Sequence, residues 1–258
     1  MRLLWLKAVV FAGVAWSMPV AASYADLADL TLAAPVIVRA TITGSERIAG
    51  RDSPGLAPGR TRLLVKAGVV AALLAPEAIP AALSYLWDAP LDARGRPPKP
   101  KGQPVLLFLA AAASDGKARL VAGTGHRPWS AADEASVRAI AAEARSRSVP
   151  VVTGVETGFR AAGTVAGESE SQFFLTTADG RGITMIVTER PGVERRVAVA
   201  RGDIIDESAA PVQRDTLLWY RLACALPAQL PAKAATDPAL AADYAAALAS
   251  LGPCGRTR

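Results

Sequence analysis

Four cations on a proline-rich segment are the feature of the sequence most able to do chemistry. Arg94, Arg96, Lys99 and Lys101 lie within eight residues, and three prolines stand among them. Prolines stiffen a chain, so such a loop has little entropy left to lose when it binds. The segment therefore predicts a binding loop for an anionic ligand or an acidic partner. The alternative is a solvated connection between two strands.

Several carboxylates could serve acid–base chemistry on a polymer. Glu168 and Glu170 fall on one side of an extended chain, and Asp203 and Asp206 follow later in the sequence. A hydrolase built on them requires one glutamate and one aspartate to meet in a cleft, within about 5 to 10 Å. Asp203, Asp206 and Glu207 match the spacing of no calcium loop, so we expect no metal site there.

Ser169 is a possible nucleophile, at the centre of the segment Gly-Glu-Ser-Glu-Ser over residues 167–171. It is similar to the elbow of serine hydrolases, but Ser171 replaces the final glycine and a strand is expected where the elbow needs a helix. Its histidine would have to be His126, the only one in the chain. We expect His126 to be exposed at a domain junction. A serine hydrolase is therefore disfavoured, and we expect no cofactor.

The only two cysteines, Cys224 and Cys254, lie near the C-terminus. An even count in an exported protein predicts one structural disulfide. A metal site would need further soft ligands, and a redox pair usually has the Cys-x-x-Cys spacing. Both remain alternatives to the structural bridge.

Residues 1–25 predict a cleavable signal peptide. Arg2 and Lys7 precede an uncharged apolar run over residues 8–16, and cleavage fits after Ala22 or Ala25. No cysteine lies near the cleavage zone, which favours release over lipid anchoring. We therefore expect a periplasmic or secreted protein, in a compartment that permits disulfides.

The charge is mildly basic. The formal net charge of +6 falls to +4 once Arg2 and Lys7 are removed. This favours acidic partners weakly and does not indicate a nucleic-acid-binding protein. Residues 67–87 are almost wholly apolar, but Glu77 and two prolines interrupt them, which predicts two buried segments and not a membrane span.

Residues 26–125 are expected to form a β-rich domain. Apolar and polar side chains alternate, or short apolar runs occur, in five segments bounded by turn residues. The predicted strands cover residues 36–43, 61–74, 83–87, 105–109 and 118–122. Five strands with long loops suit a small barrel or sandwich.

This half resembles the OB-type barrels of secreted proteins, including netrin-like modules. The resemblance rests on APVIVRATITG, RTRLLVKAGVV, and KGQPVLLFL followed by ARLVAG. Metalloproteinase inhibitors of that group use an N-terminal cysteine and several disulfides, whereas residues 23–122 contain no cysteine, so their inhibitory chemistry is not implied. The whole chain resembles an uncharacterised family of exported bacterial proteins, which implies no activity.

Residues 126–258 are expected to form an α+β domain. Ser130 can cap a helix over residues 131–146, and Asp237 can cap another that ends near Gly252. A strand, an antiparallel meander and one more helix lie between them, and the disulfide would clamp the last two helices. These elements are predicted over residues 149–155, 172–176, 183–188, 196–200 and 212–225.

Taken together, these features favour a non-enzymatic exported protein that binds an envelope protein or an anionic envelope component through its β-rich half. The rival is a carboxylate-dependent hydrolase of envelope polymer.

Overall fold

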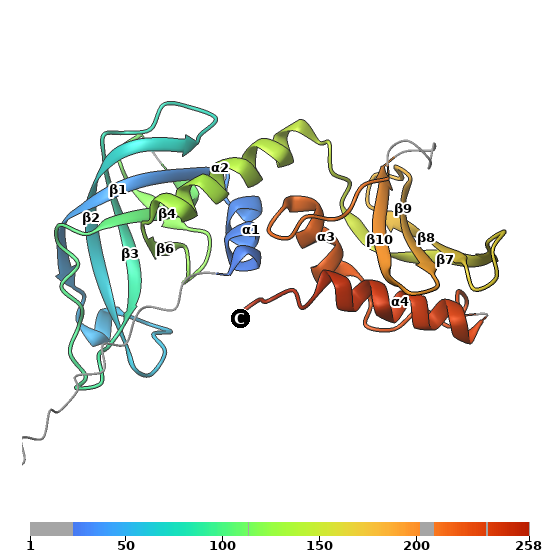
Figure 1. Ribbon diagram of the computed structural model, residues 1–258. Coiled ribbons are helices and arrows are strands. Elements are labelled where there is room, and N and C mark those ends of the chain that lie inside the picture. Colours follow the sequence, from blue (N-terminus) through green and yellow to red (C-terminus); the bar gives the residue numbers. More distant parts are fainter. Residues whose placement is uncertain (1–22, 113, 202–208, 236, 258) are drawn as a thin grey trace, which may run out of the picture.

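The computed structural model describes residues 23–112, 114–201, 209–235 and 237–257. Within them the chain is a mixed α/β protein with two antiparallel sheets. Helices α1 (Tyr24–Ala33), α2 (Ala131–Ser146) and α3 (Leu217–Ala225) lie between the sheets, and α4 (Pro238–Leu251) lies against the second sheet (Figure 1). The signal-peptide prediction falls almost wholly on residues 1–22, outside the described residues.

The first sheet contains the five strands expected from the sequence and one more. Its strand order is β3-β2-β1-β4-β5, with β6 also paired to β4. Because β6 begins at His126, this sheet continues beyond residue 125, where the first domain was expected to end. The strands are β1 (Val36–Arg47), β2 (Arg60–Leu74), β3 (Ala82–Pro90), β4 (Pro104–Ala112), β5 (Ala118–Leu120) and β6 (His126–Pro128), with a short 3-10 turn, Gly50–Asp52, between β1 and β2.

The alternating apolar residues of β1 to β4 share one face of this sheet and pack together. Val38, Val65 and Leu107 are fully buried in that cluster. The two edges, β3 and β5, meet at one parallel bridge between Ser84 and Lys117, where the Ser84 N–H donates to Gly116 O at 2.7 Å. No continuous ladder closes the described sheet, so a closed barrel is not shown.

Helix α1 was not expected from the sequence. The Ser23 hydroxyl accepts a hydrogen bond from the Asp26 N–H at 3.1 Å, which satisfies one free donor of the first turn. Ala25, Leu27, Ala28 and Leu30 are buried against its neighbours. The helix therefore starts inside the segment from which the two signal-cleavage positions were predicted.

The second sheet is the expected meander, joined by the strand predicted over residues 149–155, which the structure places at Val152–Ala162. Its order is β10-β9-β8-β7, and every pairing is antiparallel. Helix α2 precedes it and has the predicted bounds, because Ser130 accepts a hydrogen bond from the Asp133 N–H at 3.0 Å. The strands are β7 (Val152–Ala162), β8 (Ser169–Thr177), β9 (Ile183–Arg190) and β10 (Val193–Arg201).

The last two helices are clamped as predicted. A disulfide joins Cys224 in α3 to Cys254, just past α4, with the two Cα atoms 4.9 Å apart. Helix α3 begins at Leu217, five residues later than expected, because Asp215 takes a positive φ of 58° and Thr216 caps the helix. A disulfide in this position clamps the ends of the two helices together.

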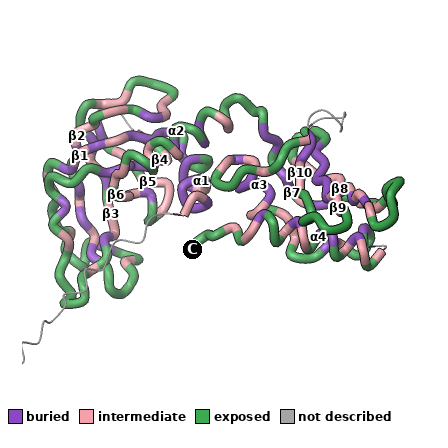
Figure 2. The backbone as a smooth tube through the Cα atoms, in the orientation of Figure 1, coloured by how far each residue is buried: buried purple, intermediate pink, exposed green. Residues whose placement is uncertain are grey.

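One apolar core connects the two sheets. It contains Ile37 and Phe108 from the first sheet, Phe173 and Met185 from the second, and residues of all four helices. Figure 2 shows buried residues on the strands and on the inner faces of the helices, and exposed residues along the outer loops.

The apolar segment 67–87 forms most of the β2–β3 hairpin. Within the described part of the chain, no helix is long and apolar enough to cross a membrane.

Candidate functional site

The four predicted binding cations lie on the loop between β3 and β4, at one end of the first sheet. The loop between β1 and β2 reaches the same end (Figure 1). The Leu91 N–H donates to Gly59 O at 2.9 Å, and the Gly102 N–H donates to Ile42 O at 2.7 Å. These bonds join the two loops and attach the second one to β1. We call the surface formed by residues 47–60 and 91–101 the basic end.

Asp92 organises the first part of the loop. One of its carboxylate oxygens accepts hydrogen bonds from the N–H groups of Arg94 and Arg96, both at 2.8 Å, and the other accepts from Arg96 Nε at 2.8 Å. These hydrogen bonds, led by the backbone N–H of Arg96, hold the pKa of Asp92 below its usual range. Arg96 is therefore partly neutralised, and the turn that carries Arg94 is fixed.

The other three predicted cations have no such carboxylate partner for their side chains among the described residues. The charged side-chain nitrogens of Arg94, Lys99 and Lys101 form no ion pair within 4.0 Å with a carboxylate of the described residues, and all three residues are exposed. Sequence reasoning missed Arg47 and Arg60, which the fold brings to the same end from β1 and β2. Only the antiparallel pairing of β2 with both β1 and β3 brings these residues together.

A hollow of about 580 Å³ lies inside this loop, between Pro90 and Lys99, with Asp92 and Arg96 in its wall. Below the loop, Arg62 binds Asp88 through two hydrogen bonds of 2.6 and 2.8 Å, one to each carboxylate oxygen. This contact holds the pKa of Asp88 below its usual range and ties β2 to β3. The basic end is thus braced from beneath by a bidentate ion pair.

The carboxylates of the hydrolase hypothesis are only partly described, since Asp203 and Asp206 lie outside the described residues. Glu168 and Glu170 line one hollow of about 220 Å³ beside β8. Glu168 lies 3.7 Å from Arg190, and Glu170 accepts a hydrogen bond from Gln172 at 2.7 Å. The pairing that the mechanism requires therefore stays a prediction.

The serine segment does not form an elbow. Strand β8 begins at Ser169, so a strand and not a helix follows, as expected. The hydroxyl of Ser171 is fully buried and donates to Asp243 at 2.6 Å. No histidine lies beside either serine, because His126 belongs to the first sheet.

The expectation that His126 is exposed was wrong. Its ring stacks on Trp87 with the centroids 3.7 Å apart and the planes 2° from parallel. The Tyr85 hydroxyl lies 2.9 Å from its Nδ1. Burial lowers the pKa of His126 to about 4. The neutral imidazole of His126 therefore links β6 to β3 and is part of the packing of the first sheet.

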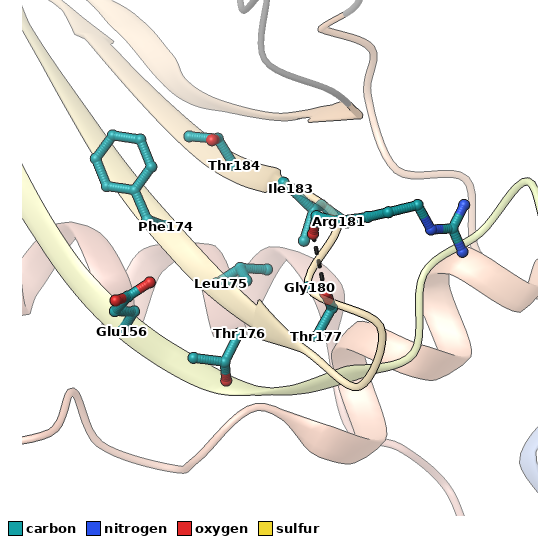
Figure 3. Close-up of a pocket in the computed structure, with 10 residues that line it drawn as sticks. Glu156, Phe174, Leu175, Thr176, Thr177, Gly180, Arg181, Ile183 and Thr184 are labelled. Carbon is teal, nitrogen blue, oxygen red and sulfur yellow. Dashed lines mark hydrogen bonds between the residues drawn. The ribbon is translucent and has the colours of Figure 1, made fainter.

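A third hollow, of about 410 Å³, lies at the β8–β9 end of the second sheet (Figure 3). Glu156, Phe174 and Thr184 line it, and the Phe174 ring is 6.0 Å from that of Phe159. Arg181 points away from the hollow and donates to Arg147 O. The sequence pattern did not single out these residues, which lack the paired carboxylates or nucleophile–base pair that hydrolysis needs.

Charge is distributed unevenly along the chain. From residue 23 to 128 basic side chains outnumber acidic ones, whereas after residue 128 they do not. Among the described residues no group of three or more histidine, cysteine, aspartate or glutamate side chains is placed to hold a metal ion. The basic end is therefore the strongest candidate for a binding site.

No protein-family model matches the chain, and no curated protein matches it significantly.

Proposed function

We propose that the protein is an exported, non-enzymatic binding protein that holds an anionic envelope polymer at its basic end. One observation carries this proposal. Two loops joined by a backbone hydrogen bond present Arg94, Lys99 and Lys101 at the same end of the sheet as Arg47 and Arg60. The charged side-chain nitrogens of these five residues form no ion pair within 4.0 Å with a carboxylate of the described residues. Cations held on a stiff loop bind an anionic chain at a small cost in conformational entropy.

We further propose that the first half is an OB-like barrel. The strand order β3-β2-β1-β4-β5 and the parallel bridge between Ser84 and Lys117 support it, because together they almost return the sheet to its first strand. OB folds bind extended polymers with their loops and open face. A polymer, and not a small molecule, is therefore the partner that this half suits best.

The triple variant Arg94→Ser/Lys99→Ser/Lys101→Ser is expected to bind dextran sulfate roughly 100-fold more weakly than the wild type at low salt. Each cation near an anionic surface contributes about 1 kcal/mol. Affinity would be measured by titration calorimetry, with neutral dextran as the blank. Added salt should remove most of the difference, because exposed charges are screened.

The matched control is Lys66→Ser/Arg145→Ser/Lys233→Ser, which removes the same charge from exposed positions elsewhere. Equal losses in both triple variants would mean that net charge alone drives binding. Unchanged binding in the first variant would overturn the assignment of the basic end.

Export is part of the proposal, and α1 distinguishes the two cleavage positions. Cleavage after Ala22 leaves Ser23 to cap the helix and Tyr24 to keep its edge contact with Trp219, at 5.9 Å between ring centroids. Cleavage after Ala25 removes both and cuts into a helix whose Ala25 is fully buried. We expect the mature chain to begin at Ser23, which intact-mass measurement would check; a chain that begins at Asp26 would contradict this.

A further inference from the structure

The C-terminal segment that follows Cys254 runs back to the first helix of the described chain. The Arg256 guanidinium donates from Nε to Asp29 Oδ2 at 2.9 Å and from an Nη to Asp29 Oδ1 at 3.1 Å. The Thr257 N–H donates to Asp26 Oδ1 at 3.1 Å, and its hydroxyl donates to the other oxygen of Asp26. Both carboxylates of α1 are thus held by the last residues of the chain.

Helix α3 completes this contact. The Tyr220 hydroxyl donates to Asp29, and Arg256 lies over the Tyr220 ring with 5.6 Å to its centroid. Tyr220 lies one helical turn before Cys224, so the disulfide joins the C-terminal segment to the helix that already contacts Asp29. The crosslink therefore joins two segments that both contact the first helix.

Both cysteines are half-buried and lie at the margin of the apolar core. A dithiol would reduce it by thiol–disulfide exchange: its two thiols supply two electrons and two protons, the bridge becomes two thiols, and the dithiol becomes a disulfide. The reverse exchange with an oxidant disulfide forms the bridge.

From this arrangement we infer that the Cys224–Cys254 disulfide is a redox-controlled lock on α1. In the oxidised protein, residues 254–257 are held beside α3 and clamp Asp26 and Asp29. In the reduced protein this segment is released. Helix α1 then loses its ion pair with Arg256 and its hydrogen bonds with Thr257, while it keeps its apolar contacts. This inference does not depend on what the basic end binds.

Hydrogen exchange of the amides in residues 24–33 tests the lock in folded protein before and after reduction with dithiothreitol. We expect roughly tenfold faster exchange in α1 after reduction, which corresponds to about 1.4 kcal/mol of local opening. Amides of α2 and of β8 and β9 should keep their rates. Unchanged exchange in α1, or the same acceleration throughout the chain, would overturn the inference.

The variant Arg256→Gln/Thr257→Ala separates the lock from a general effect of the crosslink. With the disulfide intact, it should already show the fast exchange of α1, and reduction should add little. Lys233→Gln, an exposed cation inside the disulfide loop, serves as the matched control and should respond to reduction like the wild type. If reduction still accelerates α1 tenfold in the double variant, residues 256 and 257 do not transmit the effect.

Discussion

Replacement of Asp243 by alanine is expected to lower the free energy of unfolding by about 3 kcal/mol, because it removes the one buried carboxylate of an ionic network and the acceptor of a buried hydroxyl. Asp243 projects from α4 and is 1% exposed. Its Oδ2 accepts from Arg160 Nε at 3.1 Å and from the Ser171 hydroxyl at 2.6 Å, while Arg195 Nε lies 3.3 Å from Oδ1. The aspartate joins the last helix to three strands of the second sheet.

Glu189 extends this network and does not replace Asp243. Arg160 also contacts Glu189 at 3.1 Å, and Arg195 contacts the other oxygen of Glu189 at 3.1 Å. Without Asp243, two guanidinium groups share a single carboxylate and the fully buried Ser171 hydroxyl loses its acceptor. A buried hydroxyl that has no hydrogen-bond acceptor costs about 1 to 3 kcal/mol of stability by itself.

Urea denaturation monitored by circular dichroism measures this effect. Asp243→Asn should lose less than Asp243→Ala, since the amide oxygen still accepts from Ser171. Glu194→Ala removes an exposed carboxylate from β10 and should change the stability by less than about 0.5 kcal/mol. A loss for Asp243→Ala no larger than that of Glu194→Ala would show that the network contributes no net stability.

Sequence reasoning succeeded where the signal is local. Helix α2 has the predicted bounds because Ser130 and the acidic first turn define its start. The strands of the first sheet were found because one side chain in two is apolar and buried, as in β1 and β2. Helix α1 was missed because its leucines and alanines follow directly on the expected signal peptide and carry no separate start signal beyond Ser23.

Long-range contacts could not be inferred in the same way. Asp243 stands on the apolar face of α4 with Leu240 and Tyr244, which is a readable sign of a buried partner. Nothing local identifies that partner as Arg160, 83 residues away. In the candidate site, too, the local feature could be predicted and the long-range contacts could not. The loop of Arg94 to Lys101 was recognised from composition, but Arg47 and Arg60 join it only through strand pairing.

His126 is expected to make stability fall as the pH falls from about 6.5 to about 4. Its ring is stacked on Trp87 and contacts the Tyr85 hydroxyl, and burial lowers its pKa to about 4. Between the two pKa values the unfolded chain binds a proton that the folded protein does not. The stability present above pH 6.5 is therefore lost progressively over this window, by about 3 kcal/mol at most.

His126→Gln isolates this effect from the carboxylates that titrate at the acidic end of the window. Glutamine can still hydrogen-bond with Tyr85 but cannot take up a proton, so the variant should be less stable at pH 7 and lack the histidine's share of the slope. Unfolding free energies of both proteins, measured from pH 4 to 7.5, should therefore converge as the pH falls. The chain has one histidine, so its NMR signal is unambiguous. An imidazole that titrates near 6.5 in the folded protein, or two parallel stability curves, would contradict the assignment, because a freely protonated ring could not be the buried partner of Trp87 and Tyr85.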